Sequence, residues 1–291
     1  MKKFLCILSI CLCRLMAGCQ AAPSADIAAT TLPVYEFTSR LCEGTPLTVT
    51  PIVTEAVSCL HDYSLSVEQM RTIASSNMVI FSGGGLEEFL EDALEGAASV
   101  VDGSAGVELL CPLEEHEHHE EEGHHHEEDP HYWLDPQNAL LMCRNIAAGL
   151  TAAYPENAQV FQKNLAQLGQ ELKALDSYGK VQLAHLSCRD LITFHDGFSY
   201  FAEAYDLHIL EAIEEEPGSE TSANRLKALI QDVESQNLPA IFVEKNGSAA
   251  SASVIAAETG CGVFTLDMAL SGGSYFDAMY HNIDTIKEAL G

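Results

Sequence analysis

Histidine and acidic residues are concentrated between Glu114 and Pro136, where the sequence reads EEHEHHEEEGHHHEEDPHYWLDP. This stretch holds seven of the 12 histidines in the chain. Imidazole and carboxylate groups are the ligands that zinc, copper and nickel accept in proteins. The composition therefore predicts that this stretch binds divalent cations, with a collecting segment that leads into a more ordered metal site.

The first part of the stretch, from Glu114 to Asp129, contains only His, Glu, Asp and one Gly. It has no apolar side chain that could anchor it to a core, so we expect a solvated, mobile loop. A charge run alone is usually only a solvated surface, but six interleaved histidines favour metal contact. The histidines of this expected secondary metal loop are His116, His118, His119, His124, His125 and His126.

His131 lies in the second part of the stretch, where three bulky apolar residues follow it directly. Asp135 and Pro136 then form the pattern of an N-cap with proline at the first helical position. We therefore expect His131 on a fixed loop just before a helix. Asp135 could also orient a metal ligand, but capping is the commoner use.

Three further candidate ligands, His61, His195 and Asp267, stand at expected strand ends or on loops. A single buried histidine is more often a hydrogen-bonded core residue than a ligand, so each needs support from its context. Three imidazoles and one carboxylate would form the tetrahedral set that suits Zn²⁺. Glu244, which also ends an expected strand, is an alternative carboxylate.

Short β-prone runs alternate with helical patterns along the chain, which predicts the α/β class. We expect two lobes, each with a small, mostly parallel sheet flanked by helices. The expected strands are 27–32, 48–53, 77–81, 191–194, 208–212, 240–243 and 263–266. The expected helices are 66–75, 86–94, 136–150, 199–205, 224–235 and 275–290. Since open α/β sheets bind ligands beyond the carboxyl ends of their strands, the metal site is expected in the cleft between the lobes.

One long helix is expected to join the lobes, because five apolar residues recur at helical spacing. They are Phe161, Leu165, Leu168, Leu172 and Leu175. A helix of about 20 to 25 residues would extend roughly 30–38 Å, enough to run along both lobes. We therefore expect an N-terminal lobe from 27 to 153, a linking helix within 154–183 and a C-terminal lobe from 184 to 291.

The first 18 residues have the basic start and short apolar run of a secretory signal peptide. The following Leu-Met-Ala-Gly-Cys resembles a lipobox, which would make Cys19 the lipid-modified first residue and 19–26 a tether. Arg14 and Met16 depart from the usual pattern, so simple cleavage is the alternative. We expect an exported protein, lipid-anchored to the outer face of the cell membrane or periplasmic.

The formal net charge of −29 makes nucleic acid a poor partner and a cation a natural one. We expect a monomer. Export permits disulfides, but the six other cysteines outside the signal peptide include no CxxC pair and allow fifteen pairings, so their redox state stays open. They are Cys42, Cys59, Cys111, Cys143, Cys188 and Cys261.

Several motifs together resemble the zinc and manganese class of solute-binding proteins that serve ABC metal importers. The resemblance extends over essentially the whole mature sequence. Its elements are CLH at 59–61, GGGLEEFL at 83–90, DPHYWLDP at 129–136, FHDGFSYFAEAY at 194–205 and LD at 266–267. The motifs around His131 and His195 are the more specific ones.

The resemblance implies a fold of two α/β lobes joined by one backbone helix, with the metal held between them. His61, His131 and His195 match the three family histidines, and Asp267 matches a carboxylate position that some zinc members replace with water or another acid. Manganese members carry an acid where His195 stands, so zinc is favoured. Residues 27–50 depart from the family pattern, so we expect a trimmed or rearranged start of the first lobe.

The function implied is capture of Zn(II) outside the cytoplasm and delivery to an ABC permease, with the membrane contacted through the lipid anchor only. We expect no enzymatic activity. The alternatives are manganese or another divalent metal, a zinc hydrolase and a surface adhesin. A hydrolase would need an open coordination position and a general base, and the sequence has no HExxH motif.

Overall fold

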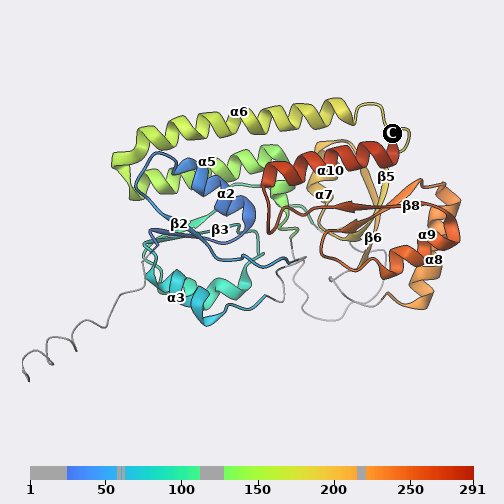
Figure 1. The fold of residues 1–291 in the computed structure, drawn as a ribbon, viewed down its shortest axis with the longest axis horizontal. Coiled ribbons are helices and arrows are strands. Elements are labelled where there is room, and N and C mark those ends of the chain that lie inside the picture. Colours follow the sequence, from blue (N-terminus) through green and yellow to red (C-terminus); the bar gives the residue numbers. More distant parts are fainter. Residues whose placement is uncertain (1–24, 58–59, 61–62, 112–127, 215–220) are drawn as a thin grey trace, which may run out of the picture.

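Two groups of strands lie next to each other along the longest axis of the molecule, and one long helix passes over both (Figure 1). This computed structural model describes residues 25–57, 60, 63–111, 128–214 and 221–291. Each group is a four-stranded parallel sheet. The structure confirms the expected α/β class with two lobes and a linking helix.

The first sheet has the order β2-β1-β3-β4. Its strands are β1 (Ile27–Ala29), β2 (Val49–Pro51), β3 (Met78–Phe81) and β4 (Val100–Asp102). The flanking helices are α2 (Leu32–Leu41), α3 (Val67–Ser75), the 3-10 turn η1 (Glu88–Leu90) and α4 (Glu91–Leu94). Ala28 packs with Ile73 of α3, whereas its neighbour Ile27 packs in the cluster that contains Phe37 of α2. Helices thus cover both faces, as parallel sheets require.

The second sheet repeats the same arrangement, with the order β6-β5-β7-β8. Its strands are β5 (Asp190–His195), β6 (His208–Glu214), β7 (Ala240–Glu244) and β8 (Gly262–Leu266). The helices of this lobe are α7 (Ser199–Ala204), α8 (Ala223–Gln236), α9 (Ala250–Thr259) and α10 (Tyr275–Leu290). In the register of β7 and β8, Glu244 lies opposite Leu266, so these strands end at the same edge.

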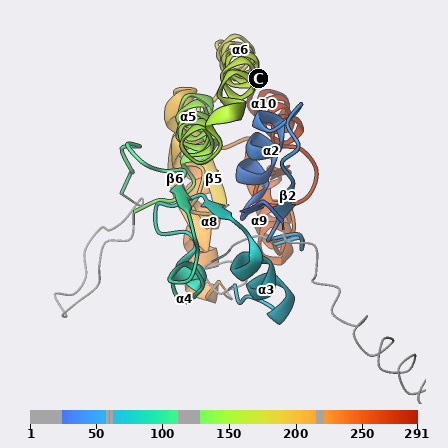
Figure 2. The ribbon, with the colours of Figure 1, turned by 90° about the vertical axis from the view of Figure 1, so that its left-hand side faces the viewer.

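Two helices pack side by side above the first sheet, and the longer of them extends to the second lobe and joins the two (Figures 1 and 2). They are α5 (Pro136–Ala153), which follows the 3-10 turn η2 (Tyr132–Leu134), and α6 (Ala158–Gln182), which follows η3 (Pro155–Asn157). Within α6, the stripe residues Phe161, Leu168, Leu172 and Leu175 are all buried. The helix has 25 residues, which confirms the expected length of the linking helix.

A second connection between the lobes is formed by residues 268–275, here called the crossing segment. These residues follow β8 of the second sheet but bind the first lobe: Leu32 N–H donates to Leu270 O at 3.0 Å, and Trp133 Nε1 donates to Met268 O at 2.9 Å. Glu36 accepts a hydrogen bond from Tyr275 N–H at 2.6 Å, so a residue of α2 caps α10. The lobes are therefore held together at two places.

The strand expected at 27–32 ends at Ala29, and helix α2 begins at Leu32. Thr31 has extended backbone before the helix, and Pro33 falls within its first two positions, where proline fits and no amide hydrogen is needed. Residues 27–51 thus form a short strand, a helix of 10 residues and a second short strand, and no trimming of the first lobe is evident among them. β4 and α9 were also not predicted.

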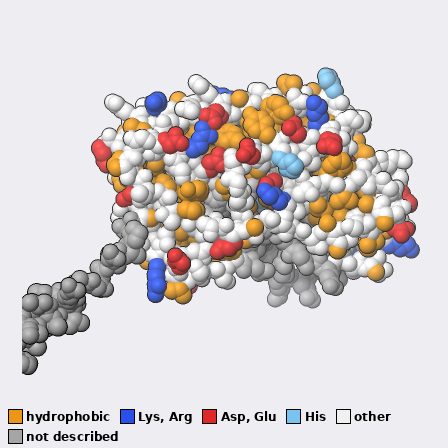
Figure 3. Space-filling view, in the orientation of Figure 1, with side chains coloured by type: hydrophobic (Ala, Val, Ile, Leu, Met, Phe, Trp, Pro, Cys, Tyr) orange, Lys and Arg blue, Asp and Glu red, His pale blue; other side chains and the backbone are white. Residues whose placement is uncertain are grey.

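Charged side chains are scattered over the face shown in Figure 3 and do not gather into one patch. No helix in the described ranges combines the length and the apolar character that crossing a membrane requires.

Five cysteines lie in these ranges, and all five are free thiols. Burial raises the pKa of the Cys42 thiol to about 12, which suits a structural rather than a reactive thiol.

Candidate metal centre

His131 is a buried loop residue directly before η2, with 1% of its surface exposed. Its backbone N–H and its ring Nδ1 both lie 2.9 Å from Oδ1 of Asp129. A carboxylate at Nδ1 favours the tautomer with the proton on that nitrogen, which leaves the Nε2 lone pair available. Nε2 is buried and has no hydrogen-bond partner among the described residues. This is the arrangement of a histidine prepared to bind a metal through Nε2.

Asp129 is a candidate positioning residue for His131 that the sequence did not reveal. It is 3% exposed, and its backbone is held from two directions. Tyr200 of α7 donates its hydroxyl to Asp129 O at 2.8 Å and accepts from Leu110 N–H at 2.8 Å, while Asp129 N–H donates to Leu110 O. Burial raises the pKa of the Tyr200 hydroxyl, so it stays a donor. The only signal in the sequence was an aspartate two positions before the histidine.

His195 ends β5 and is 4% exposed. Its Nδ1 lies 3.9 Å from Oε1 of Glu244, which ends the neighbouring strand β7. Parallel strands bring these residues together, since Thr193 pairs with Phe242 and each candidate lies two residues further on. The expectation that the ligand residues lie at the carboxyl ends of strands is correct for this pair.

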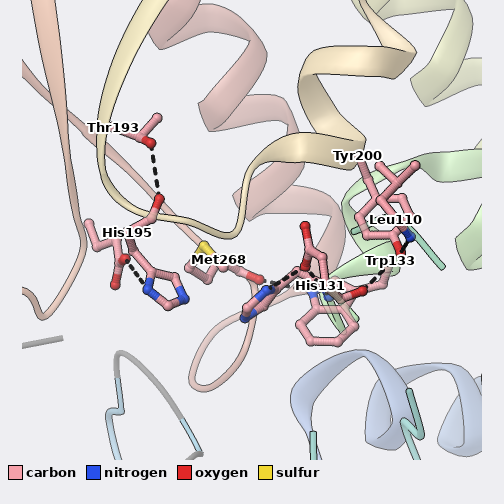
Figure 4. A network of polar contacts seen from close by, with 9 residues as sticks. Leu110, His131, Trp133, Thr193, His195, Tyr200 and Met268 are labelled. Carbon is pink, nitrogen blue, oxygen red and sulfur yellow. Dashed lines mark hydrogen bonds and ion pairs between the residues drawn. The ribbon is translucent and has the colours of Figure 1, made fainter. Parts of the chain in front are cut away.

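The two imidazoles converge from different lobes. Their ring centroids are 5.2 Å apart and their planes are inclined by 87°. Figure 4 shows both rings with Met268 between their backbones. Gly197 lies against the same group: a Cβ added there would be 2.9 Å from His195 Cδ2, 3.0 Å from His131 Nδ1 and 2.5 Å from Met268 Cε. Glycine is therefore needed for the rings to approach.

Asp267 follows β8 and is 8% exposed. Its Oδ1 accepts a hydrogen bond from Ala269 N–H at 2.9 Å, and its Oδ2 lies 2.7 Å from Lys245 Nζ. Asn282 of α10 binds both backbone groups of Asp267. Its Oδ1 accepts from Asp267 N–H and its Nδ2 donates to Asp267 O, each at 2.7 Å. In this structure the carboxylate thus serves as a turn cap and as the partner of a lysine.

His61 lies outside the described residues. So do Cys19 and the six histidines of the expected secondary loop, His116, His118, His119, His124, His125 and His126. Within the described part of the chain, no group of three or more His, Cys, Asp or Glu side chains is arranged to hold a metal ion. The structure therefore shows two of the expected primary ligands together, with Glu244 beside one of them.

The residues present fit a zinc ion. Two buried imidazoles lie edge-on with ring centroids 5.2 Å apart, and one of them already has its Nδ1 bound to a carboxylate and its Nε2 buried without a hydrogen-bond partner among the described residues. Imidazole nitrogen is a preferred zinc ligand, and a carboxylate behind it fixes the ring. A buried nitrogen without a partner costs free energy unless a ligand satisfies it.

Comparison with known proteins identifies the family of the chain. The family model described as zinc-uptake complex component A, periplasmic, matches residues 27–289. The zinc-binding lipoprotein AdcA of Streptococcus pneumoniae serotype 4 is 30% identical over 307 aligned positions, covering 99% of this chain and 61% of that protein. The zinc-binding protein AdcA of Streptococcus pyogenes serotype M1 is 28% identical over 288 positions, covering 90% of this chain and 55% of that protein.

A solved structure gives the same fold. The crystal structure of ZnuA superposes with a TM-score of 0.79 at 26% identity, and the match covers 92% of this chain and all of that one. The chain spans 55% and 61% of the length of the two curated AdcA proteins. The shared part contains both lobes, and the curated proteins are longer.

Proposed function

Because the chain belongs to the family of periplasmic zinc-uptake components, we propose that it captures Zn²⁺ between its lobes and delivers it to the permease of an ABC transporter. The observation that carries the proposal is the pair of buried imidazoles, His131 and His195, with ring centroids 5.2 Å apart and with the Nε2 of His131 buried without a hydrogen-bond partner among the described residues. Zinc is the cargo, and capture and release require no covalent chemistry.

The proposed primary ligands are His61, His131, His195 and Asp267. Glu244 and water are the alternatives at the fourth position, and the 3.9 Å separation of Glu244 from His195 supports keeping it as one. If Glu244 is not a metal ligand, its carboxylate would orient the His195 imidazole, as the Asp129 carboxylate orients that of His131. Either role leaves the two imidazoles as the centre of the site.

Zinc is favoured over manganese because the site is rich in nitrogen. Manganese prefers carboxylate, carbonyl and water oxygens, whereas imidazole suits zinc, copper and nickel. The AdcA relatives are named as zinc-binding proteins, which supports the same choice. Protons compete with the metal for imidazole nitrogens, so affinity should decrease as the pH falls.

The metal content of protein purified without added metal or chelator tests the proposal. We expect about one tightly bound zinc per molecule after the loop 114–128 has been deleted, and displacement only by metals that bind imidazole strongly. Isothermal titration with Zn²⁺ and competition with Mn²⁺ supply the affinities. Preferential binding of Mn²⁺, or no tight binding of either ion, would contradict the proposal.

Release is proposed to follow a small relative motion of the lobes when the permease binds. The crossing segment and α6 tie the lobes at two places, so a wide opening would break hydrogen bonds such as Trp133 Nε1 to Met268 O. Small shear of packed elements is compatible with two such ties. A shift of His131 relative to His195 would then be enough to weaken the site.

The loop histidines at 116, 118, 119, 124, 125 and 126 are proposed to form weaker zinc sites that raise the local metal concentration or sense its abundance. Deletion of 114–128 separates these sites from the primary one. We expect the deletion to lower the zinc stoichiometry while the tight site remains. An unchanged stoichiometry would show that the loop does not collect zinc.

Export and lipid anchoring at Cys19 are proposed from the signal-like start of the chain, together with a monomeric state. Mass spectrometry of the mature N-terminus distinguishes a diacylglyceryl cysteine from simple cleavage. Cys19→Ala should move the protein from the membrane fraction to the soluble fraction. Light scattering coupled to gel filtration tests the monomer.

A further inference from the structure

Lys245 is the residue directly after Glu244 at the end of β7, and its Nζ lies 2.7 Å from Asp267 Oδ2. The backbone on both sides of this ion pair is fixed. Lys245 N–H donates to Leu266 O at 2.8 Å, and Asn282 binds both backbone groups of Asp267. The pair therefore joins the ends of two adjacent strands in one defined geometry.

Both oxygens of Asp267 are engaged. Oδ1 accepts from Ala269 N–H, and that bond belongs to the turn that starts the crossing segment. Oδ2 is held by Lys245, whose side chain is about half exposed to solvent while the aspartate side chain is 11% exposed. The bond to the backbone amide stays in place as long as the turn does. The ammonium is the partner that can leave, because it can move into water.

The ion pair is linked to the two imidazoles through the neighbours of Asp267 in the chain. Leu266, before Asp267, is opposite Glu244, whose carboxylate is 3.9 Å from His195. Met268, after Asp267, has its side chain against Gly197, which lies between the two histidine rings. Of the two Asp267 oxygens, only Oδ2 can be made available to a cation without breaking the turn.

We infer that Lys245 competes with the bound metal for Asp267, so that Zn²⁺ gains this carboxylate as a ligand only by displacing the ammonium. This inference rests on the proposed function and adds a residue that tunes it. Displacement reduces the free energy of zinc binding that Asp267 contributes as the fourth ligand, because the ion pair with Lys245 must break before the metal–oxygen bond forms. It also gives a route for release, since the ammonium returns to Oδ2 as the metal leaves. Lys245 thus keeps zinc binding weaker, and zinc dissociation faster, than the ligand set alone would allow.

The test is a double-mutant cycle with Zn²⁺ as the probe. Lys245→Met keeps the length of the side chain without its charge, and Asp267→Asn keeps the oxygen that caps Ala269 N–H while removing the carboxylate. Zinc affinity is measured by competition with a chelator, and dissociation by stopped flow, for the wild type, both single variants and the double variant. We expect Lys245→Met to tighten zinc binding by about three- to tenfold and to slow dissociation similarly, the scale of a partly exposed ion pair.

In the Asp267→Asn background the same change should have no effect on affinity, because the carboxylate for which the ammonium competes is absent. Lys180→Met is the matched control: Lys180 is also about half exposed and pairs with Asp176 at 2.9 Å, but on α6. It should leave the affinity unchanged. Equal tightening by the control, or by Lys245→Met in both backgrounds, would show a general charge effect and overturn the inference.

A second readout does not depend on affinity. The rate at which an acylating reagent modifies Lys245, followed by peptide mass spectrometry, should increase several-fold when zinc is added to the wild type and should not respond to zinc in Asp267→Asn. Tight zinc binding with an unchanged affinity of Lys245→Met would overturn this inference alone. Absence of zinc binding by the wild type would overturn the proposed function, and this inference with it.

Discussion

The imidazole of His131 lies edge-on to that of His195, with ring centroids 5.2 Å apart, although 64 residues separate them in the chain. One ring comes from the loop before α5 and the other from the end of β5. Neither lobe alone contains the pair. Anything that changes how the lobes meet therefore changes the distance between the two imidazoles.

Replacing either histidine should abolish tight zinc binding. Removal of a metal ligand lowers metal affinity at least as much as removal of a residue that orients a ligand. We therefore expect His131→Ala and His195→Ala each to weaken zinc binding at least about 100-fold. Calorimetric titration of the loop-deleted protein measures this. His208→Ala is the control, because its side chain is 63% exposed and pairs with Asp190 elsewhere on the sheet. Tight binding retained in both histidine variants would exclude this site.

Asp129→Asn should weaken zinc binding by about tenfold without unfolding the protein, because the carboxylate holds the proton of His131 on Nδ1. Asn keeps the shape of the side chain but loses its charge. Asp135→Asn is the comparison, since Asp135 caps α5 through Gln137 N–H and is not a partner of His131. It should lower thermal stability slightly and leave the affinity as it was. Equal affinities in both variants would remove Asp129 from the site.

Gly197→Ala should weaken zinc binding by forcing the two imidazoles and Met268 apart. Overpacking of a buried position costs about 1–3 kcal/mol, which corresponds to roughly 5- to 150-fold in affinity if it falls on the metal-binding geometry. The fluorescence of Trp133, the single tryptophan, reports binding, because its ring centroid is 5.5 Å from that of His131. Gly96→Ala, where an added Cβ meets no atom within 4 Å, should bind zinc normally. Normal binding by Gly197→Ala would mean that the rings tolerate a wider spacing.

Glu87 should make stability depend on pH. Burial raises the pKa of this carboxyl from 4.5 to about 7, against the hydrogen bonds from Thr30, Ser82 and Gly83 that lower it. The folded chain then binds the proton more strongly than the unfolded chain. The contribution of Glu87 to stability is full below about pH 4.5 and is lost as the pH rises through 7.

Urea denaturation of the metal-free protein at several pH values tests this effect. Between pH 5 and 8, the wild type should lose on the order of 2–3 kcal/mol of unfolding free energy that Glu87→Gln does not lose. Glu88→Gln, at the exposed neighbouring position, should follow the wild type. Identical pH slopes for all three proteins would show that Glu87 does not titrate in this range.

The sequence predicted those parts of the fold that local patterns determine. The helix expected at 66–75 is found as α3, where Ser66 and Gln69 form a capping box at its start, and the apolar stripe from Phe161 predicted α6 correctly. Helix α2 was missed because its start depends on Thr31 and Pro33 within a run that also reads as a strand. Local pattern alone did not decide between the two.

The candidate site was predictable in its histidines but not in their partners. His131 and His195 stand in recognisable motifs. The contact of Asp129 with His131 forms only because an irregular loop places its carboxylate beside Nδ1 of the imidazole. The pairing of Lys245 with Asp267 joins residues 22 positions apart, at the ends of neighbouring strands. No periodicity in the sequence encodes such a contact. Only the paired strand ends bring the two charges together.

The crossing segment has a consequence for how the polypeptide can be divided. Phe37 of α2 packs edge-on against Tyr275 at a centroid distance of 4.9 Å, and one continuous set of buried apolar side chains runs from Ile27 through Trp133 to Leu290. The interior of the amino-terminal half is thus completed by residues of α10. Fragments cut at the linking helix would each expose part of that shared interior, so residues up to Leu290 must be synthesised before either half can bury its apolar side chains.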